Sequence, residues 1–220
     1  MKEHEYQILK RQRPWREAYY YQKSDTLYQL TYVFCQRFLP KHGDRTVDQM
    51  IQAARSGKQN IIEGTEAGET STETHIKLLN VARSSLQELR EDYRDYLQSR
   101  NLSIWSSEHD RYEKMTRFCK QHNQVEDYKP FFEKWTNEEM ANTALTLCFM
   151  TDRMLNNQLK KLENDFVKQG GIKERMHAAR TGFRQAQDHE LQSLRQEVKH
   201  LKAENQRLLS MLAQLGIEEG

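Results

Sequence analysis

The C-terminal stretch of the chain carries the pattern that most restricts its fold. From residue 191 the apolar side chains recur at alternating intervals of three and four residues without a slip. A sustained repeat with a mean spacing of about 3.5 residues predicts a left-handed coiled coil. The predicted seam consists of Leu191, Leu194, Val198, Leu201, Asn205, Leu208, Leu212 and Leu215. We therefore expect a coiled-coil helix over 191–216.

The composition of this seam favours two parallel strands. With Leu191 at heptad position a, the a series reads Leu, Val, Asn, Leu, and the d series is leucine throughout. That combination is typical of parallel dimers. Asn205 fixes the register, because two facing asparagines can hydrogen-bond to each other, whereas out of register each would be buried unpaired against leucine.

Charges beside the seam agree with parallel pairing. In the same frame Glu190 faces Arg195 of the partner chain, and Glu197 faces Lys202. Each exposed pair contributes only about 0.2–1 kcal/mol, so these pairs select orientation more than they add stability. The alternative is a single helix docked on the rest of the chain, which does not need so strict a repeat.

The preceding residues predict an all-α fold. Only 9 glycines and 3 prolines interrupt 220 residues, and apolar residues recur at helical spacing in four long segments. The first predicted helix spans 24–39, and the second begins at Asp44 or Thr46 and ends at Gly64 and Gly68. The third begins in the run 69–73, which is rich in N-cap residues, and continues through Tyr96. The fourth begins with a capping box of Thr136 and Glu139 and ends at Gly170. Between the last two we expect a connector with one short helix around Tyr112, Met115 and Phe118.

Four such helices favour an antiparallel up-and-down four-helix bundle, followed by the C-terminal coiled coil. The predicted organisation is an N-terminal basic and aromatic arm over 1–23, the bundle over 24–171, a connector helix over 172–190 and the parallel coiled coil over 191–216.

Composition limits the classes of function. The formal net charge is +2 and the mean hydropathy is −0.98, so neither a strongly basic domain nor a membrane-spanning segment is expected. The expected location is the cytoplasm, without a membrane partner. Cys35, Cys119 and Cys148 are odd in number and widely spaced, which predicts buried thiols rather than disulfides.

Nucleic-acid binding must then rest on local patches. Basic side chains neutralise phosphates, and aromatic rings stack on unpaired bases. The candidates in the arm are Lys10, Arg11, Arg13, Trp15, Arg16 and Tyr20, and those on the predicted second and third helices are Arg55, Lys58, Lys77, Arg83 and Arg90. The alternative is an arm whose rings pack on the bundle and a helix face whose charges are merely solvated.

Motifs for catalysis are not found, and we expect no enzyme activity, cofactor or metal. Two Glu-x-x-His pairs occur, Glu174 with His177 and Glu197 with His200. Di-iron bundles use this spacing on helices of the bundle itself. Both pairs lie outside the predicted bundle, so they do not predict a metal site.

Two motifs stand on the predicted second and third helices, the first at Ser56, Asn60, Ile61, Glu63 and Gly64 and the second at Ala82, Ser85, Leu86, Glu88 and Leu89. They resemble the signature of the four-helix-bundle family related to the 23S rRNA intervening-sequence protein. The sequence from Gly170 to Met176 resembles the branch of that family with an added suffix segment. The resemblance covers roughly residues 24 to 180. It implies an up-and-down bundle. One relative, the accessory variability determinant of retroelements, forms a pentameric ring that binds a reverse transcriptase and nucleic acid through basic residues.

Two hypotheses follow. In the first, the protein is a non-catalytic oligomeric accessory factor that binds RNA or DNA, beside a reverse transcriptase or other polymerase-type protein. In the second, it is a protein-interaction scaffold dimerised by its coiled coil, without nucleic-acid binding. A two-stranded coil cannot pair all subunits of a five-membered ring. Either the bundle forms no pentamer here, or the coil assembles differently or joins two rings.

Overall fold

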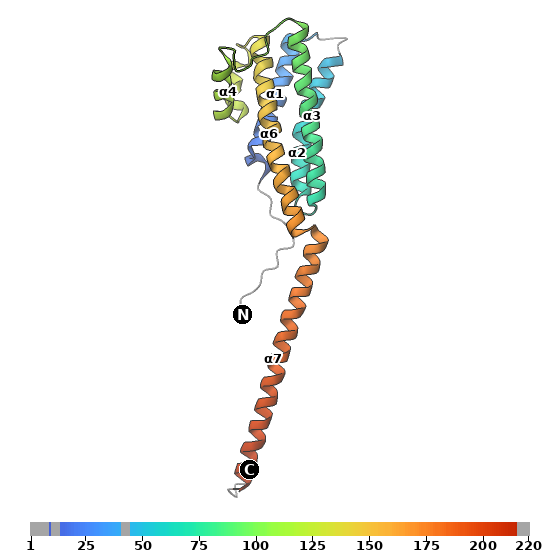
Figure 1. Ribbon diagram of the computed structural model, residues 1–220, viewed down its shortest axis with the longest axis vertical. Coiled ribbons are helices and arrows are strands. Elements are labelled where there is room, and N and C mark those ends of the chain that lie inside the picture. Colours follow the sequence, from blue (N-terminus) through green and yellow to red (C-terminus); the bar gives the residue numbers. More distant parts are fainter. Residues whose placement is uncertain (1–8, 10–13, 41–44, 215–220) are drawn as a thin grey trace. The chain divides into compact units, whose positions relative to one another are not determined.

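The structure is a computed structural model that describes residues 9, 14–40 and 45–214 (Figure 1). This part of the chain contains helices and no strand, so the predicted all-α class is confirmed. None of the described helices is long and apolar enough to span a membrane. The elements are a 3-10 turn η1 (Trp15–Glu17) and the helices α1 (Tyr19–Phe38), α2 (Arg45–Ala67), α3 (Thr72–Ser99), α4 (Tyr112–Gln121), α5 (Val125–Phe132), α6 (Asn137–Gln169) and α7 (Ile172–Gln214).

The chain divides into two compact units. One spans Leu9–Ile172, and the other contains the chain from Lys173 onward. Within the first unit, α1 packs against α2 and α6, and α3 packs against the same two helices. Figure 1 shows these four long helices side by side, with α4 next to α6. The predicted connector helix and coiled coil form one continuous helix, α7.

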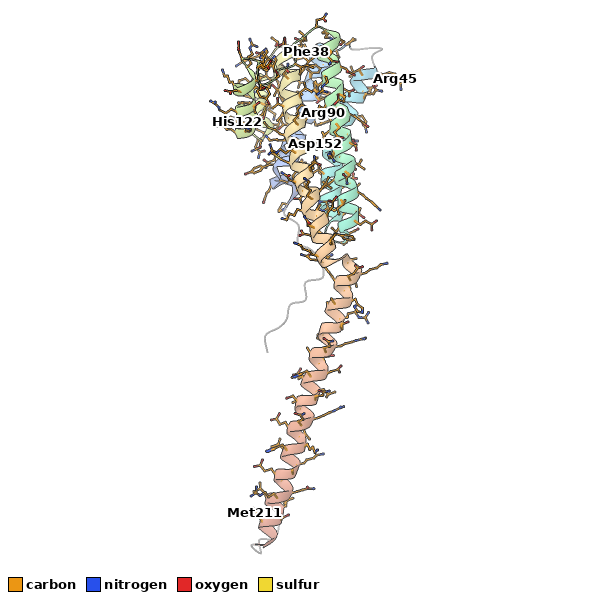
Figure 2. All side chains as sticks on the ribbon, in the orientation of Figure 1. Phe38, Arg45, Arg90, His122, Asp152 and Met211 are labelled. Atoms are coloured by element: carbon orange, nitrogen blue, oxygen red, sulfur yellow. The ribbon has the colours of Figure 1, made fainter. Side chains whose placement is uncertain are left out.

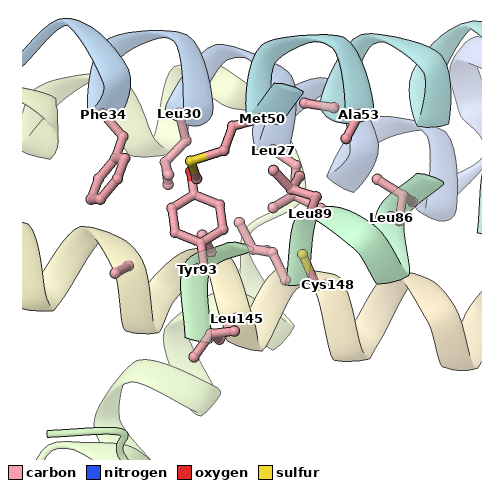
Figure 3. Close-up of a cluster of buried hydrophobic side chains, with 14 of the residues drawn as sticks. Leu27, Leu30, Phe34, Met50, Ala53, Leu86, Leu89, Tyr93, Leu145 and Cys148 are labelled. Carbon is pink, nitrogen blue, oxygen red and sulfur yellow. The ribbon is translucent and has the colours of Figure 1, made fainter. Parts of the chain in front are cut away.

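The core of the first unit is built from the apolar faces of the four long helices (Figure 3). Phe34 of α1 contacts Tyr93 of α3 edge-on, with ring centroids 5.0 Å apart. The buried Tyr93 hydroxyl donates a hydrogen bond to Thr31 Oγ1 at 2.9 Å, so its polar atom is satisfied inside the core. Other fully or nearly fully buried members are Leu27, Leu30, Met50, Leu86, Leu89, Leu145 and Cys148.

Several predicted helix ends are confirmed. Ser71 caps α3 and accepts a hydrogen bond from the Thr74 backbone. The capping box of Thr136 and Glu139 starts α6, and Gly170, with a φ of 66°, ends it. This backbone conformation favours glycine because a side chain would clash there.

Three expectations about the helices were wrong. The first helix begins earlier than Ser24, at Tyr19, because Tyr20 and Tyr21 pack against the core instead of belonging to an arm. Gly64 lies inside α2, which continues to Ala67. The connector holds a second helix, α5, despite Pro130; Gln124 and Asp127 form its capping box.

Two side-chain donors of α1 hold α4 and α5 in place. Lys23 is 1% exposed, and its ammonium donates hydrogen bonds to the carbonyl oxygens of Cys119 and His122 at the end of α4. Burial lowers the pKa of Lys23. Arg37 donates to the carbonyl of Phe132 at the end of α5. The carbonyl groups at both helix ends thereby find partners that the helices themselves cannot supply.

The contact between α2 and α3 depends on glycine. A Cβ atom at Gly57 would lie 2.5 Å from Leu86 Cδ2 and 2.7 Å from Leu86 Cγ. At Gly64 it would lie 3.1 Å from the Cβ of Leu78. A side chain at Gly57 would therefore have to displace the buried Leu86, so the backbone of α2 packs directly against α3 at this position.

We predict that Gly57→Ala destabilises the protein. Alanine gains about 1 kcal/mol of helix propensity, but overpacking against the buried Leu86 costs about 1–3 kcal/mol. Urea unfolding of Gly57→Ala, Leu86→Ala and the double variant measures the coupling between the two positions. In the Leu86→Ala background the same glycine substitution should stabilise, because the clash is gone and the propensity gain remains. A destabilisation of equal size in both backgrounds would contradict the packing role.

Candidate interaction surfaces

Part of the predicted basic arm can be located. Lys10, Arg11 and Arg13 lie outside the described residues. Trp15 donates a hydrogen bond from Nε1 to Glu66 at 3.3 Å, and the Arg16 guanidinium lies 4.0 Å from the Trp15 ring centroid. Tyr20 is partly buried, and burial raises its pKa. Tyr20 therefore packs on the core, while Arg16 remains exposed to solvent.

Two of the basic candidates on α2 and α3 are paired across helices. Lys58 forms an ion pair with Asp25 of α1 at 3.1 Å. Arg83 donates from Nε to Asp152 of α6 at 2.8 Å. Their side chains are only partly exposed. Both cations therefore link the long helices to each other.

The other basic candidates of α3 are paired within that helix. Lys77 binds Glu73 at 2.7 Å, and this pair lowers the pKa of Glu73 through its hydrogen bond and its charge. Arg90, labelled in Figure 2, binds Glu91 at 2.9 Å, and its guanidinium lies 5.0 Å from the ring centroid of Phe149. A phosphate has to compete with these carboxylates, although such surface pairs are individually weak.

Arg55 differs from its neighbours. It is exposed on α2 and makes no ion pair with any residue that the structure describes. Together with Arg16 it is one of two candidates whose charge is not matched by a carboxylate in that part of the chain. Sequence reasoning could not foresee the pairing of Lys58 and Arg83, because their partners Asp25 and Asp152 are 33 and 69 positions away.

The residues that carry the family resemblance meet at the contact of α2 and α3. The Ser56 and Ser85 hydroxyls lie 2.9 Å apart, and Asn60 donates to the Ser56 carbonyl at 2.9 Å. Ser56 and Ser85 line a groove of about 650 Å³, which Glu88 and Asp92 also line. Burial, followed by the charges of Asp95 and Glu88, raises the pKa of Asp92. No group of three or more metal-ligating side chains gathers within the described ranges.

The three cysteines are buried and form no disulfide with one another, as predicted. Burial raises the pKa of Cys119 to about 11, and it also raises the pKa of Cys148. Because the thiolate is the nucleophilic form, these two thiols are unreactive at neutral pH.

The predicted seam of α7 is open to solvent. Its apolar members from Leu191 to Leu212 are each 40–53% exposed, and Leu215 lies outside the described residues. Asn205 is exposed among them. In Figure 2 the side chains of α7 project outward along its length as far as Met211.

The charged residues beside this seam are also unpaired. Among the described residues, none of Glu190, Arg195, Glu197 and Lys202 takes part in an ion pair, and the one pair formed within α7 joins His200 and Glu204 at 3.9 Å. The helix therefore presents both an apolar stripe and the flanking charges that a parallel partner would match.

Comparison of the chain with protein-family models, with curated proteins and with solved structures finds no match.

Proposed function

We propose that this protein is a self-assembling interaction scaffold, in which α7 pairs in parallel with α7 of a second copy. The observation that carries the proposal is the exposed leucine seam of a 43-residue helix. Burial of a fully exposed leucine side chain lowers the free energy by about 1.5–3 kcal/mol, so two such seams associate favourably. A second copy is the best-fitting occupant because its seam has the same 3.5-residue period.

Asn205 and the flanking charges select the arrangement. In a parallel, in-register pair the two Asn205 side chains meet and hydrogen-bond to each other. The same register brings Glu190 to Arg195 of the partner and Glu197 to Lys202. An antiparallel pair would bury Asn205 against leucine, leaving its amide unsatisfied.

The first unit is proposed to be an antiparallel up-and-down bundle of α1, α2, α3 and α6. The order in which these helices pack supports this topology, since each contacts two neighbours. The short link between Ala67 and Thr72 also favours a reversal of direction. Membership of the family related to the 23S rRNA intervening-sequence protein is also proposed. It is supported by two motif residues, Ser56 and Ser85, whose hydroxyls join α2 to α3, and by Asn60, which donates to Ser56 within α2.

Nucleic-acid binding is the second candidate function, with RNA or DNA beside a polymerase-type protein. Arg16 and Arg55 favour it, because their charges are not matched by carboxylates in the described part of the chain. The scaffold is favoured by the other basic candidates, because each is paired with a carboxylate; they are Lys58, Lys77, Arg83 and Arg90.

For the scaffold we predict a dimer that depends on the seam. Sedimentation equilibrium of the wild type should give twice 26.3 kDa, independent of salt. Leu201→Asp places a carboxylate from each chain in the seam and should give 26.3 kDa, with loss of helical circular dichroism from the C-terminal half of α7. Ser193→Asp is the matched control: it makes the same kind of change on the outward side of the heptad and should remain dimeric.

Two results would contradict this assembly. A mass of five times 26.3 kDa that Leu201→Asp leaves unchanged would assign assembly to the bundle. Equal effects of Leu201→Asp and Ser193→Asp would mean that the seam has no special role.

The salt dependence of RNA binding separates the two candidate functions. Fluorescence anisotropy with a labelled single-stranded RNA, at about 50 and 200 mM salt, should show no binding if the scaffold is correct. If Arg16 and Arg55 neutralise two phosphates, affinity should fall about sevenfold across that range. Arg55→Gln should then weaken binding, whereas Arg94→Gln, which removes a cation already paired with Glu91, should have little effect. Salt-dependent binding that Arg55→Gln abolishes would favour the accessory factor.

A further inference from the structure

A cavity of about 480 Å³ lies between α4, α6 and the segment that precedes α4. Its size is within the range of small-molecule sites in proteins, about 300–1,000 Å³. Trp105, Tyr112, Phe149 and Met150 contribute apolar and aromatic surface to its walls. None of the assembly features described above involves this cavity.

Hydrogen bonds hold one wall of the cavity rigid. The Asn142 side chain of α6 accepts from the Trp105 backbone at 2.8 Å and donates to the Ser103 carbonyl at 2.8 Å. The Trp105 indole donates to Glu138 at 2.8 Å, and its ring stacks on His109 with centroids 4.9 Å apart. The wall is therefore formed in advance of any ligand, which lowers the entropic cost of binding.

The charge at the cavity has one sign. Lys120 of α4 and Arg153 of α6 both line it, and neither forms an ion pair with a described residue. No carboxylate of the described chain lines it. Two carboxylates of α6 near the cavity have other partners, since Asp152 binds Arg83 and Glu139 binds Arg111. Two unmatched cations in a cavity that aromatic side chains also line attract an anion that carries an apolar group.

From this combination we propose that the cavity binds a small organic anion with a flat apolar group. The flat group lies among Trp105, Tyr112 and Phe149, and the anion lies at Lys120 and Arg153. This site is independent of the pairing of α7.

The test uses the full chain and two fluorescent probes of similar shape. Anilinonaphthalene sulfonate carries an anion, and N-phenyl-1-naphthylamine carries none. The wild type should bind the sulfonate at least about tenfold more tightly than the uncharged probe. Lys120→Gln with Arg153→Gln should remove that preference. Arg117→Gln with Lys160→Gln is the matched control, because it removes exposed cations from the same two helices outside the cavity.

A second measurement locates the probe. The indole N–H resonance of Trp105, assigned with Trp105→Phe, should shift in the wild type when the sulfonate is added. Displacement of the probe by 1-naphthyl phosphate or by 1-naphthoate would identify the natural anion as a phosphate or a carboxylate. The proposal is overturned if neither compound displaces the probe, if Trp105 does not respond, or if both double variants bind the sulfonate as the wild type does.

Discussion

A long helix that exposes an uninterrupted apolar seam needs a surface to cover it, and this constraint organises the proposed assembly. The apolar residues from Leu191 to Leu212 are roughly half exposed along α7. In water such a stripe lowers its free energy by associating, and its strict period restricts the partner to another helix of the same period. Asn205 reduces the free energy gained by association, but it makes one register more stable than the others.

In the first unit, close contacts between helices determine the packing. Gly57 and Gly64 let α3 approach the backbone of α2, and the Ser56–Ser85 contact lies at the same interface. Ser56, Gly64 and Ser85, which belong to the two sequence motifs, thus have a direct packing role. Two charged side chains of α2 and α3 also link the helices, because Lys58 pairs with Asp25 of α1 and Arg83 pairs with Asp152 of α6.

Local patterns predicted the fold well, whereas the surfaces depend on distant residues. Helical spacing and the Thr136 capping box are properties of neighbouring positions, so the long helices and the start of α6 were predictable. The helix α5 was missed because its stretch was assigned to a connector with one short helix, and Gly64 suggested a helix end because its packing partner is not visible in sequence. The cavity at Trp105 was missed as well, since three separate segments line it.

Disulfide cross-linking tests the parallel, in-register pairing of α7 most directly. Leu194→Cys places one thiol at the same height on each chain, so mild oxidation should give a covalent dimer on a non-reducing gel. Gln192→Cys, on the outer side of the helix, should remain monomeric under the same conditions, and the three native cysteines are buried. Failure of Leu194→Cys to cross-link, or equal cross-linking of both variants, would contradict the account.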